Sequence, residues 1–432
     1  MTAATAETAE RRSYCDYRRS VRDRTSFKGP RIRMKFIDLE TQQKRIGTSL
    51  DRRIRQVLDH GQYINGPEVN ELEEALAGYI GVKHAVGCAS GTDALLMSLM
   101  AYGVGPGDIV FTTPFTFIAT AEVISLLGAI PVFVDINPET FNLNPAELER
   151  AIHALETDDS SLHPLPSCRG SLPEGKRPLV PKGVIAVDLF GLPADYDAIT
   201  TIAREHGLFL IEDAAQSFGA EYKSRKSCSL ADVACTSFFP SKPLGCYGDG
   251  GMCFTNDEKL AHILRSLRMH GMGDDRYQNV RIGINGRLDT IQAAVLLAKF
   301  EIFSDEVRLR REAAAQYSRA FARGPSGPSG LAFQAIPPGR ESIWAQYSIL
   351  ARDLQHRNLI LKALIEAEIP SAVYYPIPLH LQQAFGWLGY AKGDFPVSEA
   401  HADRIFSIPI HPYLGGEAQQ QIVETICSVC DL

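Results

Sequence analysis

The sequence has no stretch that could span a membrane and no exported leader. No apolar run approaches the roughly 18–20 residues that a membrane helix needs. Residues 1–33 hold eight arginines and one lysine against four acids, without a hydrophobic segment, and this excludes a secretory signal. The formal net charge of −7 gives no overall nucleic-acid or membrane-surface signal. We therefore expect a cytoplasmic protein that binds neither nucleic acid nor membrane, with a basic, disordered arm over residues 1–33.

The chain also lacks the fingerprint of the common dinucleotide-binding folds. No G-x-G-x-x-G opens a helix anywhere in the sequence. The glycines at 103, 105 and 107 follow an expected helix and precede an expected strand, the wrong order for that fingerprint. These absences count against a nicotinamide-dependent enzyme.

Cysteine pairs with metal-site spacing are scarce. Nine cysteines are scattered along the chain, and the pair Cys427 and Cys430 stands alone at its C-terminal end. Zinc sites of the ribbon type need a second such pair. We expect reduced thiols and no metal site.

What the sequence does contain is an alternation of short apolar strands and amphipathic helices between residues 82 and 211. Such alternation predicts an α/β fold with a mainly parallel sheet and helices on both faces. Residues 156–182, rich in proline, serine and mixed charge, interrupt it and are interpreted as a surface loop or insertion.

The length of 432 residues predicts two domains. We assign a large α/β domain to residues 34–303 and a smaller α+β domain to residues 304–432. The boundary is expected between a helix over 291–303 and a second helix over 308–323.

The most unusual stretch surrounds Lys242. It runs from Ser237 to Gly251, and Pro240 and Pro243 prevent helix formation and ladder pairing on either side of the lysine. A lysine held on a stiff turn at a strand end is partly desolvated, which lowers the pKa of its amine and makes it a candidate Schiff-base nucleophile. A surface lysine at a strand edge explains the stretch equally well.

Three further signals are each ambiguous alone. Ser90 to Asp93 join a strand to a buried helix, where free N–H groups suit a phosphate but plain N-capping is an equal reading. Asp213 ends an apolar strand with Gln216 close behind, where it would face a ligand crevice or cap a following helix. The loop after residue 112 carries Phe115 and Phe117.

Together these signals match the requirements of pyridoxal 5′-phosphate. The lysine would bind the aldehyde, the acid would keep the pyridine nitrogen protonated, and the helix end would hold the phosphate. An aromatic side chain would lie against the ring.

At these residues the sequence resembles the DegT/DnrJ/EryC1/StrS sugar aminotransferases, which have fold type I. The resemblance extends from about residue 35 to the C-terminus, and its motifs are jointly specific. It implies a seven-stranded, mainly parallel sheet between helix layers, and a homodimer with shared active sites. The matching segments are residues 36–39, 90–94, 115–120, 212–217, 237–242 and 285–287.

The resemblance implies a role for each matching residue. Lys242 is the catalytic lysine and proton shuttle, Asp213 pairs with the pyridine nitrogen, and Gln216 lies near the ring hydroxyl. Phe117 stacks on the ring. The phosphate is held by Gly91, Thr92 and Ser237, with Asn285 supplied by the partner subunit; the sugar is contacted by Arg287, Tyr374, Tyr375 and His380.

Within the family the sequence is most similar to a branch that acts on UDP-2-acetamido-2-deoxy-3-oxo-D-glucuronate, on the route to surface polysaccharides such as O-antigen. The implied reaction is ping-pong transfer from glutamate, with pyridoxamine phosphate as intermediate. Arg287 suits a uronate carboxylate because its guanidinium recognises planar anions in a bidentate manner. Tyr374 stands where close relatives commonly have histidine, which leaves that contact open.

Three alternatives remain at this stage. The protein could aminate another nucleotide-linked keto-sugar, at C4 or in a neutral hexose. It could resemble the dehydratases of the family, although these replace the lysine with histidine. It could also be a non-catalytic cofactor-binding regulator, which the intact lysine, acid and phosphate set disfavours.

Overall fold

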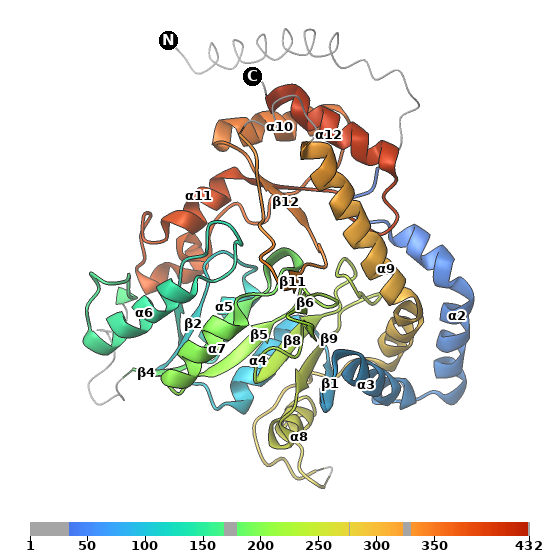
Figure 1. Cartoon of the computed structure of the whole chain (residues 1–432). Helices are drawn as coiled ribbons and strands as arrows, with labels where there is room; N and C mark the ends of the chain where they lie inside the picture. The colour runs from blue at the N-terminus through green and yellow to red at the C-terminus, as the bar shows by residue number, and fades with distance from the viewer. Residues whose placement is uncertain (1–33, 168–178, 276, 323–329, 431–432) are drawn as a thin grey trace, which may run out of the picture.

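The computed structural model describes residues 34–167, 179–275, 277–322 and 330–430; the predicted arm over residues 1–33 lies outside them. A seven-stranded sheet lies at the centre of the large lower part of the molecule (Figure 1), with the strand order β1-β9-β8-β5-β4-β2-β3. Its strands are β1 His84–Cys88, β2 Asp108–Thr112, β3 Ile130–Phe133, β4 Val180–Val187, β5 Phe209–Asp213, β8 Val233–Ser237 and β9 Gly251–Thr255.

The sheet is mainly parallel, as the βα alternation predicted. Strands β8, β5, β4, β2 and β3 pair in parallel, and β9 is antiparallel to both β1 and β8. Strand β1 therefore runs in the same direction as β8. Six strands end at the same edge of the sheet, where ligands of open α/β sheets bind.

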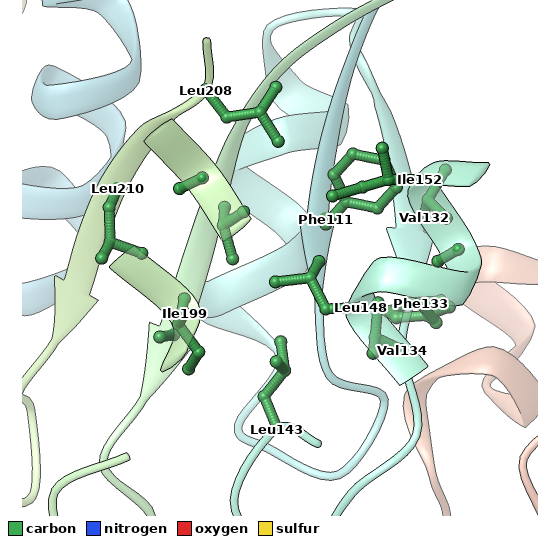
Figure 2. Packing of buried hydrophobic residues seen from close by; sticks show 14 of the residues in the cluster. Phe111, Val132, Phe133, Val134, Leu143, Leu148, Ile152, Ile199, Leu208 and Leu210 are labelled. Carbon is green, nitrogen blue, oxygen red and sulfur yellow. The ribbon is translucent and has the colours of Figure 1, made fainter. Parts of the chain in front are cut away.

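Helices cover both faces of the sheet because its strands alternate apolar side chains between the two sides. Ile109 and Phe111 of β2 face one cluster, whereas Val110 faces another. Figure 2 shows the first cluster, in which Leu148 and Ile152 pack near Phe111. That side of the sheet carries α6 Pro145–Thr157 and α7 Tyr196–Glu205. The other side carries α4 Gly91–Ala101 and α8 Glu258–Leu267, together with most of the apolar side chains of α5 Ala119–Leu126.

Two helices near the N-terminal end of the described chain pack against a long helix, α9 Thr290–Ala322. These are α2 Leu39–His60 and α3 Pro67–Ile80. Residues 61–66 separate them, and Gly61 ends α2 in a left-handed conformation with φ 68°. Among the described residues, no helix has the length and apolar character needed to cross a membrane.

The prediction of two helices around residue 303 is wrong. Helix α9 is continuous over 33 residues, because Ser304 to Val307 include no glycine or proline. Arg308 also bridges Asp305 and Glu312 on the same surface, at 2.6 Å each. The domain boundary proposed at residue 303 therefore falls inside a helix, and the division itself stays a prediction.

The C-terminal part has its own sheet and core. Strands β10 Ala332–Phe333, β12 Tyr347–Leu350 and β13 Ile405–Ile408 form a three-stranded sheet. Helices α10 Leu354–Glu366 and α12 Gly416–Cys430 and the second half of α9 supply the apolar cluster around it. Helix α11 Pro396–Arg404 and the segment before it return to the large sheet, where Phe385 and Phe395 join the first cluster. A small sheet of β6 Glu221–Tyr222, β7 Arg225–Lys226 and β11 Arg340–Glu341 completes the described strands.

The predicted loop over residues 156–182 is shorter than expected. Helix α6 extends to Thr157 and β4 begins at Val180. The described part between them is anchored, because the Nε2 atom of the buried His163 lies 2.8 Å from the Phe133 carbonyl. Residues 168–178 lie outside the described residues.

Candidate active site

Lys242 lies on the connection over residues 238–250 between two antiparallel strands, β8 and β9, as the sequence predicted. The Phe238 N–H donates to the Gly250 carbonyl at 2.7 Å, and the Cys246 N–H donates to the Phe238 carbonyl at 2.8 Å. The Lys242 N–H donates to the Phe239 carbonyl at 2.8 Å. These bonds fix the backbone on both sides of the lysine.

The environment of Lys242 favours a reactive amine over a surface cation. Burial lowers the pKa of the Lys242 amine to about 8, although the negative charge of Asp213 raises it in part. Within the described chain, no carboxylate forms an ion pair with its Nζ atom. At neutral pH a useful fraction of this amine is therefore unprotonated and nucleophilic.

Asp213 ends β5 and is only 5% exposed. Its Oδ2 accepts a hydrogen bond from the Thr120 hydroxyl at 2.8 Å, and its Oδ1 accepts from the Ala215 N–H at 3.2 Å. Burial raises the pKa of this carboxyl, while these two bonds and the charge of Lys242 lower it. No helix follows Asp213, since residues 215–219 form turns, so the helix-cap reading of this acid is wrong.

The segment from Ser90 to Thr92 lies directly against the end of β8. Ser90 caps α4 by accepting the Asp93 N–H at 3.0 Å, so the N-capping reading is correct. The first intrahelical bond is that of the Ala94 N–H, which leaves the N–H groups of Gly91 and Thr92 without an intrahelical acceptor. Capping and anion binding are therefore compatible at this helix end.

The close approach of these segments requires glycine. A Cβ atom on Gly91 would lie 2.7 Å from Ser237 Cβ, and one on Gly251 would lie 2.3 Å from the Ser90 carbonyl oxygen. The two glycines let the helix end reach the Ser237 side chain across β9. A helix N-terminus, a threonine and a serine at one strand edge are a suitable donor set for a phosphate group.

Gln216 bridges two parts of the chain far apart in sequence. Its Oε1 accepts the Phe190 N–H at 2.6 Å, and its Nε2 donates to the Tyr375 hydroxyl oxygen at 3.2 Å. The Tyr375 ring lies 6.4 Å from that of Phe117. The structure thus brings three of the predicted site residues together.

The two phenylalanines of the aromatic loop have different environments. Phe115 is fully buried, whereas Phe117 is 56% exposed. An exposed ring next to Tyr375 is available to lie against a planar ligand, and the stacking role of Phe117 stays a prediction.

Among the residues predicted to contact sugar, Tyr374 and His380 differ in setting. Tyr374 is half-buried and packs edge-on against Phe36, with ring centroids 6.4 Å apart. His380 is 2% exposed, and its Nε2 lies 3.0 Å from Glu399 Oε1. His380 belongs to an interior contact with Glu399 and Phe395, so the described geometry gives no support to its predicted sugar contact.

Asn285 and Arg287 lie together in a cavity of about 470 Å³. Its lining is strongly polar. The Nε atom of Arg287 is buried without a hydrogen-bond partner among the described residues. The Gly286 carbonyl accepts the Ala89 N–H at 3.1 Å, which ties this loop to the segment before α4. The cavity is lined by Ile64, Ala89, Gly248, Asp249, Asn285, Arg287, Asp289 and Gln292.

Thr120 is a site residue to which the sequence gave no role. It lies within a segment that matched the family, but its contact with Asp213 spans 93 positions. No local pattern predicts which acid a threonine at the start of a helix will contact.

The site fits pyridoxal phosphate. It combines an amine of lowered pKa, a buried carboxyl near that amine, an exposed aromatic ring and a glycine-lined helix end beside a serine. These groups match the aldehyde, the ring nitrogen, the ring face and the phosphate of that molecule.

Comparison with known proteins agrees with the geometry. The model of the DegT/DnrJ/EryC1/StrS aminotransferase family matches residues 44–427. The UDP-2-acetamido-2-deoxy-3-oxo-D-glucuronate aminotransferase of Pseudomonas aeruginosa is 47% identical over 381 residues, 88% of this chain and 96% of that protein. The UDP-N-acetyl-3-dehydro-alpha-D-glucosamine 3-aminotransferase of Acidithiobacillus ferrooxidans is 39% identical over 375 residues, 86% of this chain and 91% of that protein.

Solved structures give the same result. A DegT/DnrJ/EryC1/StrS aminotransferase from Brucella abortus is 47% identical, with a TM-score of 0.82 over 91% of this chain and 98% of that one. A sugar aminotransferase from Streptococcus pneumoniae, solved in its pyridoxal phosphate form, is 25% identical, with a TM-score of 0.77 over 89% of this chain and 96% of that one.

Proposed function

The chain belongs to the DegT/DnrJ/EryC1/StrS family of pyridoxal-phosphate-dependent sugar aminotransferases, and we propose that it moves the amino group of glutamate to UDP-2-acetamido-2-deoxy-3-oxo-D-glucuronate. The reaction is a two-step ping-pong transfer that leaves 2-oxoglutarate. The product would serve the synthesis of surface polysaccharide in the cytoplasm.

One observation supports this substrate over a neutral sugar. Arg287 lies in a polar cavity with a buried, unpartnered Nε atom, and no described carboxylate forms an ion pair with it. Asp249 and Asp289 line the same cavity, but neither forms an ion pair with Arg287, so a planar anion would still be stabilised there. The uronate carboxylate provides that anion. The 47% identity to the Pseudomonas aeruginosa protein named for the uronate substrate gives independent support.

Each residue of the site has a task in this proposal. Gly91, Thr92, Ser237 and the first turn of α4 bind the phosphate of the cofactor. Asp213, oriented by Thr120, holds a proton at the pyridine nitrogen. Phe117 supports the ring, and Gln216, held by the Phe190 N–H, lies near the ring hydroxyl.

Pyridoxal phosphate, when bound, supplies an aldehyde that combines with primary amines and a protonated ring that accepts electrons from the substrate carbon. Lys242 supplies the amine that retains the cofactor. Its Nζ atom then carries a proton to and from the substrate carbon, a task for which a pKa of about 8 is well matched near neutral pH.

Replacing Arg287 with alanine is expected to lower kcat/KM for the UDP-linked uronate roughly a hundredfold, because two charge-assisted hydrogen bonds are lost. The value for the corresponding neutral UDP-3-keto-sugar should change less than about threefold. Both are measured as conversion of the pyridoxamine phosphate form back to the pyridoxal phosphate form, followed by absorbance with a panel of UDP-keto-sugars.

Arg287→Lys is the matched control, since it keeps the charge but loses the bidentate geometry, and it should retain an intermediate preference. Equal losses on both sugars in Arg287→Ala would refute the uronate assignment. This change leaves Lys242 in place, so the half-reaction with glutamate, which forms pyridoxamine phosphate and 2-oxoglutarate once per site, should keep the wild-type rate. That measurement separates substrate choice from aminotransferase chemistry.

A second candidate substrate is a neutral UDP-3-keto-sugar. The relative from Acidithiobacillus ferrooxidans, at 39% identity, is named for such a substrate. The same panel distinguishes the two, because that candidate requires the neutral sugar to be preferred by the unmodified protein.

The proposal includes a homodimer in which each active site combines residues of two subunits. It is supported by the position of Asn285 and Arg287 in a cavity whose described lining includes neither Lys242 nor Ser237. Exposed apolar side chains at Tyr277 and Ile282, which are 85% and 87% exposed, lie in the segment before this loop.

Mixing two inactive variants tests the shared site. If Lys242 and Arg287 of one site come from different subunits, Lys242→Ala and Arg287→Ala chains form hybrid dimers with one intact site. Random reassociation should then restore about a quarter of wild-type activity toward the uronate. Each variant mixed with itself is the control, and failure of the hybrids to regain activity would place both residues in the same subunit.

A further inference from the structure

Two fully buried carboxylic acids lie next to the candidate site without a cation. Asp188 follows β4, and Glu212 precedes Asp213 on β5, so its side chain points to the opposite face of the sheet. Across the described part of the chain, no lysine, arginine or histidine forms an ion pair with either. Two ionised carboxylates in such a place would be strongly unfavourable.

A chain of hydroxyl groups joins the two acids. Asp188 Oδ2 lies 2.6 Å from Ser217 Oγ, which contacts Ser227 Oγ, and Ser227 Oγ lies 2.9 Å from Glu212 Oε1. A longer contact of 3.3 Å links Ser227 Oγ to Asp188 Oδ2. The sequence of oxygens is therefore carboxyl, hydroxyl, hydroxyl, carboxyl.

Counting hydrogens shows that this chain is incomplete with both acids ionised. Three oxygen–oxygen contacts need three hydrogens, whereas the hydroxyl groups of Ser217 and Ser227 supply two. The remaining oxygens are already occupied: Asp188 Oδ1 accepts the Ala194 N–H at 2.9 Å and the Tyr196 hydroxyl at 2.8 Å. A third hydrogen must come from one of the acids.

Both carboxyl oxygens of Glu212 also accept hydrogen bonds from the backbone. Its Oε1 also accepts the Cys228 N–H at 2.6 Å, and its Oε2 accepts the Leu230 N–H at 2.9 Å. A proton on either end completes the chain, with the hydroxyl groups pointing one way or the other. Both arrangements satisfy every polar atom of the group.

We propose that Asp188 and Glu212 share one proton through Ser217 and Ser227, and that this chain holds the Asp213–Gln216 turn in position. The turn is attached to it at both ends, because the Asp188 N–H donates to the Asp213 carbonyl at 3.1 Å and Ser217 follows Gln216 directly.

The titratable groups that face this pair are Tyr196 from α7 and Cys228 from the turn after β7. Neither of them supplies a positive charge. Burial raises the pKa of Asp188 to about 6 and raises that of Glu212 well above its usual range. Near pH 7 the pair therefore keeps one proton.

Asp188→Asn is the decisive variant, because an amide replaces the proton without breaking the chain. Its NH₂ group donates to Ser217, Ser217 then donates to Ser227, and Ser227 donates to Glu212. Its oxygen still accepts from Ala194 and Tyr196. Glu212→Gln cannot be accommodated in this way, since an amide at either oxygen would place a donor against the Cys228 or the Leu230 N–H.

The test compares urea unfolding of the wild-type holoenzyme and the Asp188→Asn holoenzyme between pH 6 and pH 8. Acids of the unfolded chain are ionised throughout this range. Unfolding of the wild type therefore releases the shared proton, and higher pH favours unfolding. The unfolding constant of the wild type should rise about tenfold more per pH unit than that of Asp188→Asn. Glu205→Gln, which removes an exposed carboxylate of α7, should follow the wild type.

At pH 8 we expect the Asp188→Asn holoenzyme to resist urea at least as well as the wild type. The Glu212→Gln holoenzyme should be markedly less resistant than the wild type. Identical pH slopes in the wild type and Asp188→Asn would overturn it. Infrared spectroscopy of the native wild type at pH 7.5 gives a second measurement that needs no variant to fold. A protonated-carboxyl carbonyl band is expected, and its absence would overturn the shared proton.

Discussion

Replacement of Lys242 by alanine should abolish amino transfer, lowering kcat by at least about a thousandfold. The change removes both the amine that retains the cofactor and the proton carrier, and loss of a positioned proton-transfer group alone typically costs 10²–10⁴. Turnover is measured as 2-oxoglutarate formation from glutamate with the UDP-linked keto-uronate. Borohydride reduction of the wild type should also attach the cofactor covalently to the peptide that contains Lys242.

Lys259→Ala is the matched control for this experiment. Lys259 is exposed near the start of α8, and its loss should leave turnover unchanged. A Lys242→Ala protein that still transaminates at a comparable rate would contradict the assignment of the catalytic lysine. Borohydride labelling of a lysine other than Lys242 would contradict it as well.

Replacement of Asp213 by asparagine should lower kcat by roughly a hundredfold to a thousandfold. The amide oxygen can still accept from Thr120 or Ala215, so the fold is kept, but the negative charge that holds a proton at the pyridine nitrogen is lost. Loss of one preorganised electrostatic contact commonly has this magnitude. The measurement is single-turnover conversion by glutamate, with cofactor affinity determined separately by absorbance titration.

Thr120 provides the graded comparison. Thr120→Val removes the hydrogen bond to Asp213 Oδ2 while the charge remains, so its effect on turnover should be much smaller than that of Asp213→Asn. Thr120→Ser keeps the hydroxyl group and should stay close to the wild type. If Asp213→Asn affected only cofactor affinity and left single-turnover rates unchanged, the carboxylate would not act on the ring nitrogen.

The sequence predicted the large α/β part well because its signals are local. Apolar runs such as those of β2 and β5, ended by turn residues, indicate strands, and the helices between them follow from spacing. The glycine and proline residues around Lys242 likewise predicted a stiff turn, and the structure confirms the hairpin. Each of these features depends on residues fewer than about twenty positions apart.

The prediction of a helix boundary at residue 303 failed because local sequence patterns do not show tertiary contacts. Helix α9 crosses the predicted boundary at residue 303 because a polar stretch can continue a helix when its partners lie on other elements; Gln42 of α2, for example, donates to Glu306 at 2.9 Å. The sugar contact of His380 stays a prediction, and the structure places its Nε2 atom 3.0 Å from Glu399 Oε1 in the interior. The spacing of a histidine does not show which way its ring points.

The sequence by itself determined the fold class, the family and the chemistry of the site, since a proline-bounded lysine, a strand-end acid and a glycine-serine helix start are each defined by neighbouring residues. Only the tertiary structure decided how these groups affect one another. The lowered pKa of Lys242, the Thr120 contact that orients Asp213 and the hydroxyl chain from Asp188 to Glu212 all depend on burial and on contacts between distant segments. Burial makes charge costly, and which charges are buried together is fixed only when the strands meet at one edge of the sheet.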